Sequence, residues 1–291
     1  MKTFVTGASG FIGSEIVKNL IANGHQVLGL ARSEASAEKI KTLGAAVLIG
    51  ELEDLKIIKQ GVQESDGVIH TAFIHDFSQY AKANEIDANV IKAMGEALQG
   101  TNKPLIVTSG ILGLPLMDGI ITEESKAINS PRSSEALALQ LTAEGINASV
   151  VRLPPSVHDA DMKGFVPFMI GQAHKNGFAA YVGDGKNRWT AVHRKDAAQV
   201  FVQALEKAEK AALYNAVAEE GITIKTIAAL IANKLNVPLK SVVGEEVPQY
   251  FEWMSFFIGM DSPATSTETR KILNWQPKQI GLLEEMELHY F

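Results

Sequence analysis

Short apolar runs alternate with longer amphipathic stretches along the first 110 residues. Five runs are predicted to be strands, at 2–7, 25–31, 45–50, 67–72 and 103–109, and the stretches at 10–23, 34–43, 55–60 and 80–98 are predicted to be helices. In the helix at 80–98 the apolar residues recur every three or four positions, which is typical of a helix packed on a sheet. The alternation predicts βαβ units and a parallel sheet.

The regular alternation ends after residue 109. A loop punctuated by Gly and Pro covers 110–125, and a helix at 131–144 and a sixth strand at 147–153 follow it. Ligands of open α/β sheets bind at the carboxyl ends of the strands, where this loop begins. We therefore expect the loop to form a wall of the binding site.

The elements beyond residue 154 are less regular. We expect helices at 165–175, 194–209, 224–235, 245–257 and 267–273, and a pair of strands near Tyr181 and Trp189. The predicted fold is α/β, a Rossmann-type doubly wound parallel sheet with a smaller, mostly helical C-terminal substrate-binding region. The predicted nucleotide-binding domain covers 1–155 and is completed by 186–217, while 156–185 and 218–291 form the smaller region.

Composition narrows the classes of function. The 291 residues include no Cys, which excludes disulfides, thiolate metal sites and cysteine nucleophiles. The net charge is −6 and the basic residues form no stripe, so we expect no nucleic-acid partner. We find no apolar run of about 18 residues and no signal peptide, and expect a cytoplasmic protein without a membrane partner. The seven His and the carboxylates do not cluster at ligand spacing, so no metal site is expected.

The sequence TGASGFIG at 6–13 joins the first strand to the first helix. Gly7 permits a tight turn, Gly10 lets the backbone approach a pyrophosphate, and Gly13 lets the helix lie close to the strand. Free amides and the helix dipole would hold the phosphates. The alternative is a structural turn without a ligand. The predicted dinucleotide-binding residues here are Gly7, Ser9, Gly10, Phe11, Ile12 and Gly13.

The end of the second strand indicates which cofactor to expect. Proteins that prefer NAD usually carry an acidic residue there, which holds the ribose 2′-hydroxyl. This chain has Arg32 and Ser33 instead, and a guanidinium beside a hydroxyl suits a 2′-phosphate. NADP(H) is therefore favoured over NAD(H). In the alternative reading Arg32 is a solvated residue at the start of a helix and the choice of cofactor stays open.

The glycine motif, together with HTA at 70–72 and VTSG at 107–110, resembles the extended short-chain dehydrogenase/reductases, a family that includes NAD-dependent epimerases and dehydratases. Further similar landmarks are Asn89, VRLPPSV at 151–157, WTAVHRKDAA at 189–198 and RKILNWQP at 270–277. The resemblance implies that Thr71, Ala72 and Phe73 line the adenine-ribose side of the cofactor. It also implies that Thr108 and Ser109 lie near the nicotinamide.

The chain departs from the family at its usual catalytic pair, a Tyr with a Lys four residues later. No Tyr of this sequence is followed by Lys at that spacing. If Glu135 corresponds to the family's helix glutamate, Ala127 and Pro131 occupy the positions of the pair. The chain therefore resembles an atypical subgroup, and Arg132 is the local candidate for holding a substrate oxygen or a phosphate. A surface salt bridge is the alternative role for Arg132.

Two further residues are candidates for catalysis. Ser109 would hydrogen-bond the substrate carbonyl, or would only satisfy backbone groups of the next loop. His158 would supply the proton, because imidazole titrates near neutral pH, or would only cap a loop. The aromatic segment at 251–260 would form either a wall of an apolar pocket or a contact in a homo-oligomer.

These observations predict an NADP(H)-dependent oxidoreductase whose partner is a small-molecule substrate with a carbonyl group. Two alternatives stay open. One is a non-catalytic NAD(P)-binding redox sensor, which the missing Tyr and Lys favour. The other is a sugar-nucleotide epimerase or dehydratase, which the family resemblance favours.

Overall fold

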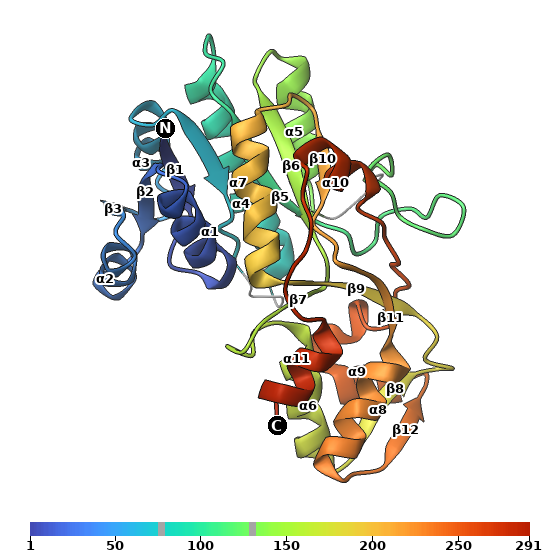
Figure 1. Cartoon of the computed structure of the whole chain (residues 1–291). Coiled ribbons are helices and arrows are strands. Elements are labelled where there is room, and N and C mark those ends of the chain that lie inside the picture. The colour runs from blue at the N-terminus through green and yellow to red at the C-terminus, as the bar shows by residue number, and fades with distance from the viewer. Residues whose placement is uncertain (75–78, 128–131) are drawn as a thin grey trace.

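The computed structural model describes residues 1–74, 79–127 and 132–291. A parallel sheet of seven strands lies between two layers of helices, and the C-terminal half adds a smaller, mostly helical region (Figure 1). This architecture confirms the predicted α/β class with a Rossmann-type sheet.

The large sheet places the ends of its strands where a nucleotide can bind. Its strands are β1 (Lys2–Thr6), β2 (Gln26–Ala31), β3 (Ala46–Ile49), β4 (Gly67–His70), β5 (Leu105–Gly110), β6 (Ala148–Leu153) and β10 (Leu213–Asn215). Their spatial order is β10-β6-β5-β4-β1-β2-β3. The order reverses between β1 and β4, and dinucleotides bind at such a reversal, outside the carboxyl ends of the strands.

Helices cover both faces of this sheet, which is why most residues of its strands are apolar. One layer consists of α1 (Phe11–Ala22), α2 (Glu34–Thr42) and α7 (Arg194–Lys207), and α1 packs against α7. The other layer consists of α3 (Leu55–Gln63), α4 (Tyr80–Leu98) and α5 (Ser134–Ala143). In α4 the buried stripe includes Val90, Met94 and Leu98, as the spacing of the apolar residues predicts.

The C-terminal region has its own apolar core. Its elements are α6 (Phe165–Asn176), β8 (Ala179–Val182), α8 (Ile224–Leu235), β12 (Leu239–Val242), α9 (Glu246–Phe251), the 3₁₀ helix η2 (Glu252–Phe256) and α11 (Leu282–His289). A small sheet of β7 (Ser156–His158), β9 (Arg188–His193) and β11 (Glu219–Thr223) connects this region to the large sheet (Figure 1). The helix α10 (Thr267–Leu273) packs against α7 and β10.

Three expectations for the second half are wrong or incomplete. The strands near Tyr181 and Trp189 do not pair with each other, because β8 pairs with β12 while β9 pairs with β7 and β11. The helix expected at 245–257 is interrupted at Glu252, whose φ of 49° lies in the left-handed region. The final helix α11 was not predicted. The expected helix start at Pro131 lies outside the described residues, and α5 begins at Ser134.

Candidate nucleotide-binding and active site

The glycine turn between β1 and α1 depends on the small size of its residues. Gly7 has φ 71°, and a Cβ there would lie 2.7 Å from Thr71 Oγ1 and 2.9 Å from the amide nitrogen of Ala72. A Cβ on Gly13 would lie 2.0 Å from the carbonyl oxygen of Gly7. The amide of Gly10 donates to that same oxygen over 2.8 Å. The turn therefore has the tight geometry expected from the motif.

The first turn of α1 presents free backbone amides. The helix begins at Phe11, its N-cap residue Gly10 provides no side-chain cap, and its first turn contains no acidic residue. The first amides of a helix have no partner within the helix, and the helix dipole favours an anion there. Ile12 lies in this first turn, Ser9 directly precedes the N-cap residue, and both are half-buried. These residues fit a pyrophosphate.

Arg32 and Ser33 follow the end of β2. Arg32 is exposed, and its side chain has no hydrogen-bond or ion-pair partner among residues 1–74, 79–127 and 132–291. Ser33 caps α2, where its Oγ accepts from the amide of Ser36 over 3.3 Å and its own amide donates to Ser36 Oγ over 3.0 Å. Arg32 is thus the more available of the two for an anionic group.

The residues that follow β4 are tied to the end of β1. Thr71 Oγ1 donates to the carbonyl oxygen of Thr6 over 2.7 Å, and the amide of Ala72 donates to Thr6 Oγ1 over 3.3 Å. The next residue, Phe73, lies beneath Arg132, whose Cζ is 4.4 Å from the centre of the phenyl ring. The predicted residues Thr71, Ala72 and Phe73 therefore extend from the glycine turn to Arg132.

A chain of buried polar side chains crosses the site, and sequence reasoning missed it. Thr6 Oγ1 lies 2.7 Å from His70 Nδ1, and His70 Nε2 donates to Asp87 Oδ1 over 3.1 Å. Ser134 Oγ donates to Asp87 Oδ2 over 2.6 Å. Burial opposes the ionisation of Asp87, yet the hydrogen bonds and charges of His70, Arg132 and Ser134 lower its pKa overall. The buried carboxylate is therefore an anion.

Arg132 lies at the end of this chain. Its Nε donates to Ser134 Oγ over 3.0 Å, and its Nη2 donates to the carbonyl oxygen of Thr108 over 3.1 Å. Burial lowers the pKa of Arg132, while the charges of Asp87 and Tyr80 act in the opposite direction. A guanidinium remains protonated under these conditions. The structure therefore places a cation at the carboxyl end of β5.

Thr108 and Ser109, the two residues predicted to lie near the nicotinamide, differ in whether the hydroxyl forms a hydrogen bond with a described residue. Thr108 Oγ1 donates to the carbonyl oxygen of His70 over 2.7 Å. The hydroxyl of Ser109, the next residue, has no hydrogen-bond partner within the part of the chain that the structure describes. Ser109 and the Arg132 cation thus occupy neighbouring positions at one strand end.

Ala127 and Pro131 are the positions expected for the family's Tyr and Lys if Glu135 corresponds to the family's helix glutamate. The amide of Ala127 donates to Glu135 Oε1 over 3.2 Å. Arg152, which is fully buried, donates to both carboxylate oxygens of Glu135 over 2.7 Å. It also donates to carbonyl oxygens of Thr122 and Ser125. This ion pair holds the loop after β5 against β6. The Lys position, Pro131, lies outside the described residues.

His158 lies on β7 and is 1% exposed. Its Nδ1 is 3.8 Å from Glu285 Oε2 and its Nε2 is 3.9 Å from Glu219 Oε2, and neither nitrogen forms a hydrogen bond to a described residue. Burial, with a smaller contribution from His193, lowers the pKa of His158 to about 3. A neutral, enclosed imidazole favours a structural role over proton donation.

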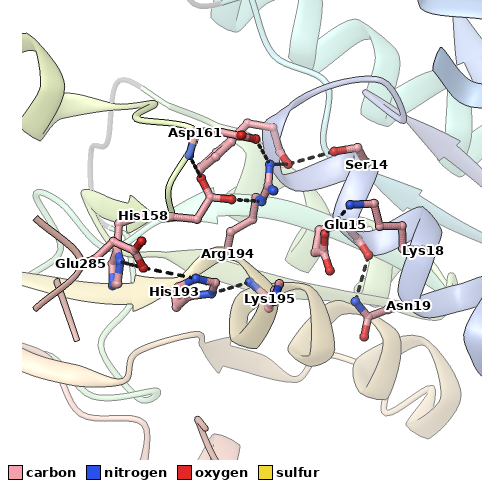
Figure 2. Close-up of polar contacts among 12 residues, drawn as sticks. Ser14, Glu15, Lys18, Asn19, His158, Asp161, His193, Arg194, Lys195 and Glu285 are labelled. Carbon is pink, nitrogen blue, oxygen red and sulfur yellow. Dashed lines mark hydrogen bonds and ion pairs between the residues drawn. The ribbon is translucent and has the colours of Figure 1, made fainter. Parts of the chain in front are cut away.

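Arg194, the first residue of α7, connects the C-terminal half to the glycine turn (Figure 2). Its Nη1 donates to the carbonyl oxygen of Phe11 over 3.4 Å and to Asp161 Oδ2 over 2.8 Å. The guanidinium carbon also lies 4.7 Å from the centre of the Phe11 ring. Sequence reasoning did not select Arg194, although it lies inside the WTAVHRKDAA landmark.

Two classes of feature are absent from the described ranges. No helix there is long and apolar enough to cross a membrane. No group of three or more His, Asp or Glu side chains in those ranges could hold a metal ion.

Comparison with known proteins identifies the class of the chain. Residues 7–154 match the model of a family described as NAD(P)H-binding, so the chain belongs to that family. An uncharacterised protein of Schizosaccharomyces pombe is 47% identical over 98% of this chain and 98% of its own length. A further relative and a solved structure of the same fold extend the comparison.

A 4-hydroxy-2-methyl-3-oxo-4-farnesyl-3,4-dihydroquinoline-1-oxide ketoreductase of Stigmatella aurantiaca is 27% identical over 74% of this chain and 67% of its own length. The structure of a dTDP-glucose 4,6-dehydratase of Streptomyces venezuelae with NAD bound superposes with a TM-score of 0.77 at 16% identity, covering 99% of this chain and 95% of that one. The chain is a member of the extended short-chain dehydrogenase/reductase-like family and binds a nicotinamide cofactor.

Proposed function

We propose that this protein is an NADP(H)-dependent oxidoreductase that reduces the carbonyl group of a small molecule. The observation that carries the proposal is the pairing of an available hydroxyl, Ser109, with a half-buried cation, Arg132, at the carboxyl end of β5. That strand end lies beside the glycine turn in the sheet order, because only β4 separates β5 from β1. Hydride chemistry at a carbonyl needs both kinds of group.

Each residue has a distinct part in the proposed reaction. The amides at the start of α1 would hold the pyrophosphate, and the bound cofactor would supply the hydride. Ser109 would donate a hydrogen bond to the carbonyl oxygen and orient the substrate. Arg132 would stabilise the negative charge that develops on that oxygen.

The preference for NADP(H) rests on Arg32. The side chain is exposed and has no partner in the described ranges, and it follows β2 at the position where an acidic residue would favour NAD. A guanidinium there can bind a 2′-phosphate with two parallel hydrogen bonds. We assign no catalytic role to His158.

Two observations support an apolar carbonyl compound as the substrate. Aromatic rings continue from Phe73 to Tyr80, Phe257 and Phe165, with successive centres 6.1, 6.5 and 5.9 Å apart. These half-buried rings come from both halves of the chain and would contact the apolar part of a substrate. The relative from Stigmatella aurantiaca is named a ketoreductase, which supports the same reaction type.

The first experiment is calorimetric titration with NADPH and NADH, followed by a spectrophotometric assay of cofactor oxidation with aldehydes, ketones and quinones. Arg32→Gln should weaken NADPH binding roughly 10- to 100-fold, because a charge-assisted hydrogen bond contributes about 1.5–3 kcal/mol. NADH binding should not change. Lys39→Gln on the exposed side of α2 is the matched charge control. Equal weakening of both cofactors would contradict the role of Arg32.

Ser109→Ala tests the catalytic part of the proposal. Loss of the hydroxyl should lower kcat/KM roughly 10- to 100-fold and leave NADPH binding unchanged, because the hydroxyl acts on the substrate. Unchanged turnover would remove Ser109 from the mechanism. Binding of cofactor without turnover of any carbonyl compound would favour the redox sensor in place of the enzyme.

A further inference from the structure

The proposed reduction lacks the family's usual proton donor, because no Tyr of this sequence is followed by a Lys four residues later. We propose that Tyr80 donates the proton to the carbonyl oxygen, and that Arg132 takes the place of the missing Lys beside it. This inference rests on the proposed function. It assigns the acid to the start of α4 and not to the start of α5.

The position of Tyr80 on α4 directs it toward the site. Tyr80 is the first residue of the helix, and Asp87 lies two turns later on the same face. Ala83 and Asn84, which lie between them on that face, are buried. Since Asp87 contacts His70 and Ser134, this face of α4 points toward the ends of β4 and the start of α5.

Tyr80 and Arg132 share a common neighbour. The ring centre of Tyr80 lies 6.1 Å from that of Phe73, in an edge arrangement, and Arg132 Cζ lies 4.4 Å from the same Phe73 ring. The Tyr80 ring also lies 6.5 Å from Phe257 of the C-terminal region. Tyr80 therefore packs beside Phe73, which contacts the Arg132 cation, and beside a ring of the C-terminal region.

Electrostatics agrees with this placement. A negative charge on Tyr80 raises the pKa of Arg132 and so opposes the effect of burial. The buried carboxylate of Asp87 is the other charged group that acts on Arg132, and Ser134 bridges the two. A phenolate left at Tyr80 after proton transfer would thus face a guanidinium that remains charged.

The other tyrosines are poorly placed for this role. Tyr214, Tyr250 and Tyr290 are buried in apolar cores, and burial raises the pKa of each, to about 12 for Tyr250. Tyr181 lies on β8, where its ring faces Lys225 at 5.2 Å. Tyr80 is the one tyrosine with a recorded contact to the Phe73 and Arg132 pair within the described ranges.

The step balances with the reagents of the proposed function. The bound cofactor would supply the hydride for the new C–H bond at the carbonyl carbon, and the π electrons of the C=O bond would move to oxygen. That oxygen takes the proton from Tyr80, which breaks the phenolic O–H bond and leaves a phenolate beside Arg132. Solvent water then returns a proton to Tyr80. The net change is reduction of one carbonyl to an alcohol and oxidation of one NADPH.

The test compares Tyr80→Phe with Tyr181→Phe in the full-length protein. Tyr80→Phe should lower kcat roughly 100-fold or more, the usual contribution of a general acid, and leave the Kd for NADPH unchanged. The isotope effect with deuterium on the transferred position of NADPH should rise, because hydride transfer without an acid becomes rate-limiting. Tyr181→Phe should behave like the parent protein.

Rescue variants separate catalysis from a structural effect. Tyr80→His restores a titratable donor, so it should recover part of the lost activity and move the optimum to lower pH. Arg132→Lys should retain more activity than Arg132→Gln, because only the first keeps a cation beside Tyr80. A merely structural role for Tyr80 would produce neither pattern.

The outcomes distinguish this inference from the proposed function. Full turnover by Tyr80→Phe would overturn the role of Tyr80 and leave the oxidoreductase intact. Loss of NADPH binding in Tyr80→Phe would also overturn it, because the residue would then act through the cofactor site. Absence of turnover in the parent protein would overturn the proposed function and this inference with it.

Discussion

Substitution of Gly13 by Ala tests whether contact between the glycine turn and α1 is as tight as the geometry indicates. The new Cβ would lie 2.0 Å from the carbonyl oxygen and 2.7 Å from the carbonyl carbon of Gly7. Carbon and oxygen atoms normally stay about 3.3 Å apart, so the turn would have to move by about 1.3 Å. The obstructing atoms are backbone, and no side-chain rotation can relieve the contact.

The magnitude follows from two opposing effects. Overpacking a tightly packed site costs about 1–3 kcal/mol, and a clash with the backbone of the turn after β1 should lie at the upper end of this range. Alanine favours a helix over glycine by roughly 1 kcal/mol, which offsets part of the loss. Gly13→Ala should therefore lower the free energy of unfolding by about 2 kcal/mol. It should also weaken NADPH binding, because the displaced turn carries the phosphate-binding amides.

Gly10→Ala is the matched control. Its Cβ would meet the Gly7 carbonyl oxygen at 3.0 Å, and Gly10 is exposed at the surface of the turn. Urea unfolding without cofactor should show a loss below about 1 kcal/mol for this variant. Calorimetry should nevertheless show weakened NADPH binding, because the methyl group occupies the approach of the pyrophosphate. A Gly13→Ala protein as stable as Gly10→Ala would refute this reasoning.

Two further predictions concern buried charges. Glu135→Gln leaves Arg152 buried without its counter-ion and should lower stability by about 3–5 kcal/mol in urea unfolding, and a loss below about 1 kcal/mol would contradict this. The pKa of His158 is about 3 in the folded protein, against an ordinary value of 6.5. Below pH 6.5 this side chain therefore binds a proton in the unfolded state but not in the folded state. Stability should therefore fall by about 2 kcal/mol between pH 6.5 and pH 5. If the stability of His158→Gln changes with pH as much as that of the parent protein, His158 is not the source of this pH dependence.

The nucleotide-binding half was predictable because its signals are local. A parallel sheet covered on both faces needs continuously apolar strands, and those of β1, β2, β4 and β5 are readable from short windows. The glycine turn joins neighbouring elements, and the contacts of Gly10 and Gly13 with Gly7 involve positions close in sequence. β10 was missed because its three residues are too few to produce a pattern.

The C-terminal region was harder to predict because its pairings are distant. β8 pairs with β12, about sixty residues later, and each strand has only four residues. Positive φ angles at Gly183 and Gly185 turn the chain after β8, so that β9 enters a different sheet. Neither feature can be inferred from hydrophobic periodicity alone.

One residue of the buried polar chain at the site, Asp87, can be recognised from the sequence pattern. Asp87 lies on the stripe of α4 that also carries Ala83, Val90 and Ile91, and a charged residue on an apolar stripe requires a buried partner. The identity of that partner depends on how α4 meets β4 and α5, which is a tertiary property. His70 is the last residue of an apolar strand, and the strand pattern does not indicate its contact with the Asp87 carboxylate.

The cost of this polar chain bears on the choice between enzyme and sensor. Burying a carboxylate and a guanidinium costs several kcal/mol per ion, and apolar residues of similar volume would often stabilise such a position equally well. In return, Asp87 and Ser134 hold Arg132 at the end of β5, where its Nη2 donates to the carbonyl oxygen of Thr108, the residue before Ser109. A cation fixed there would stabilise the negative charge that develops on a substrate oxygen in a carbonyl reductase. The arrangement therefore favours the enzyme.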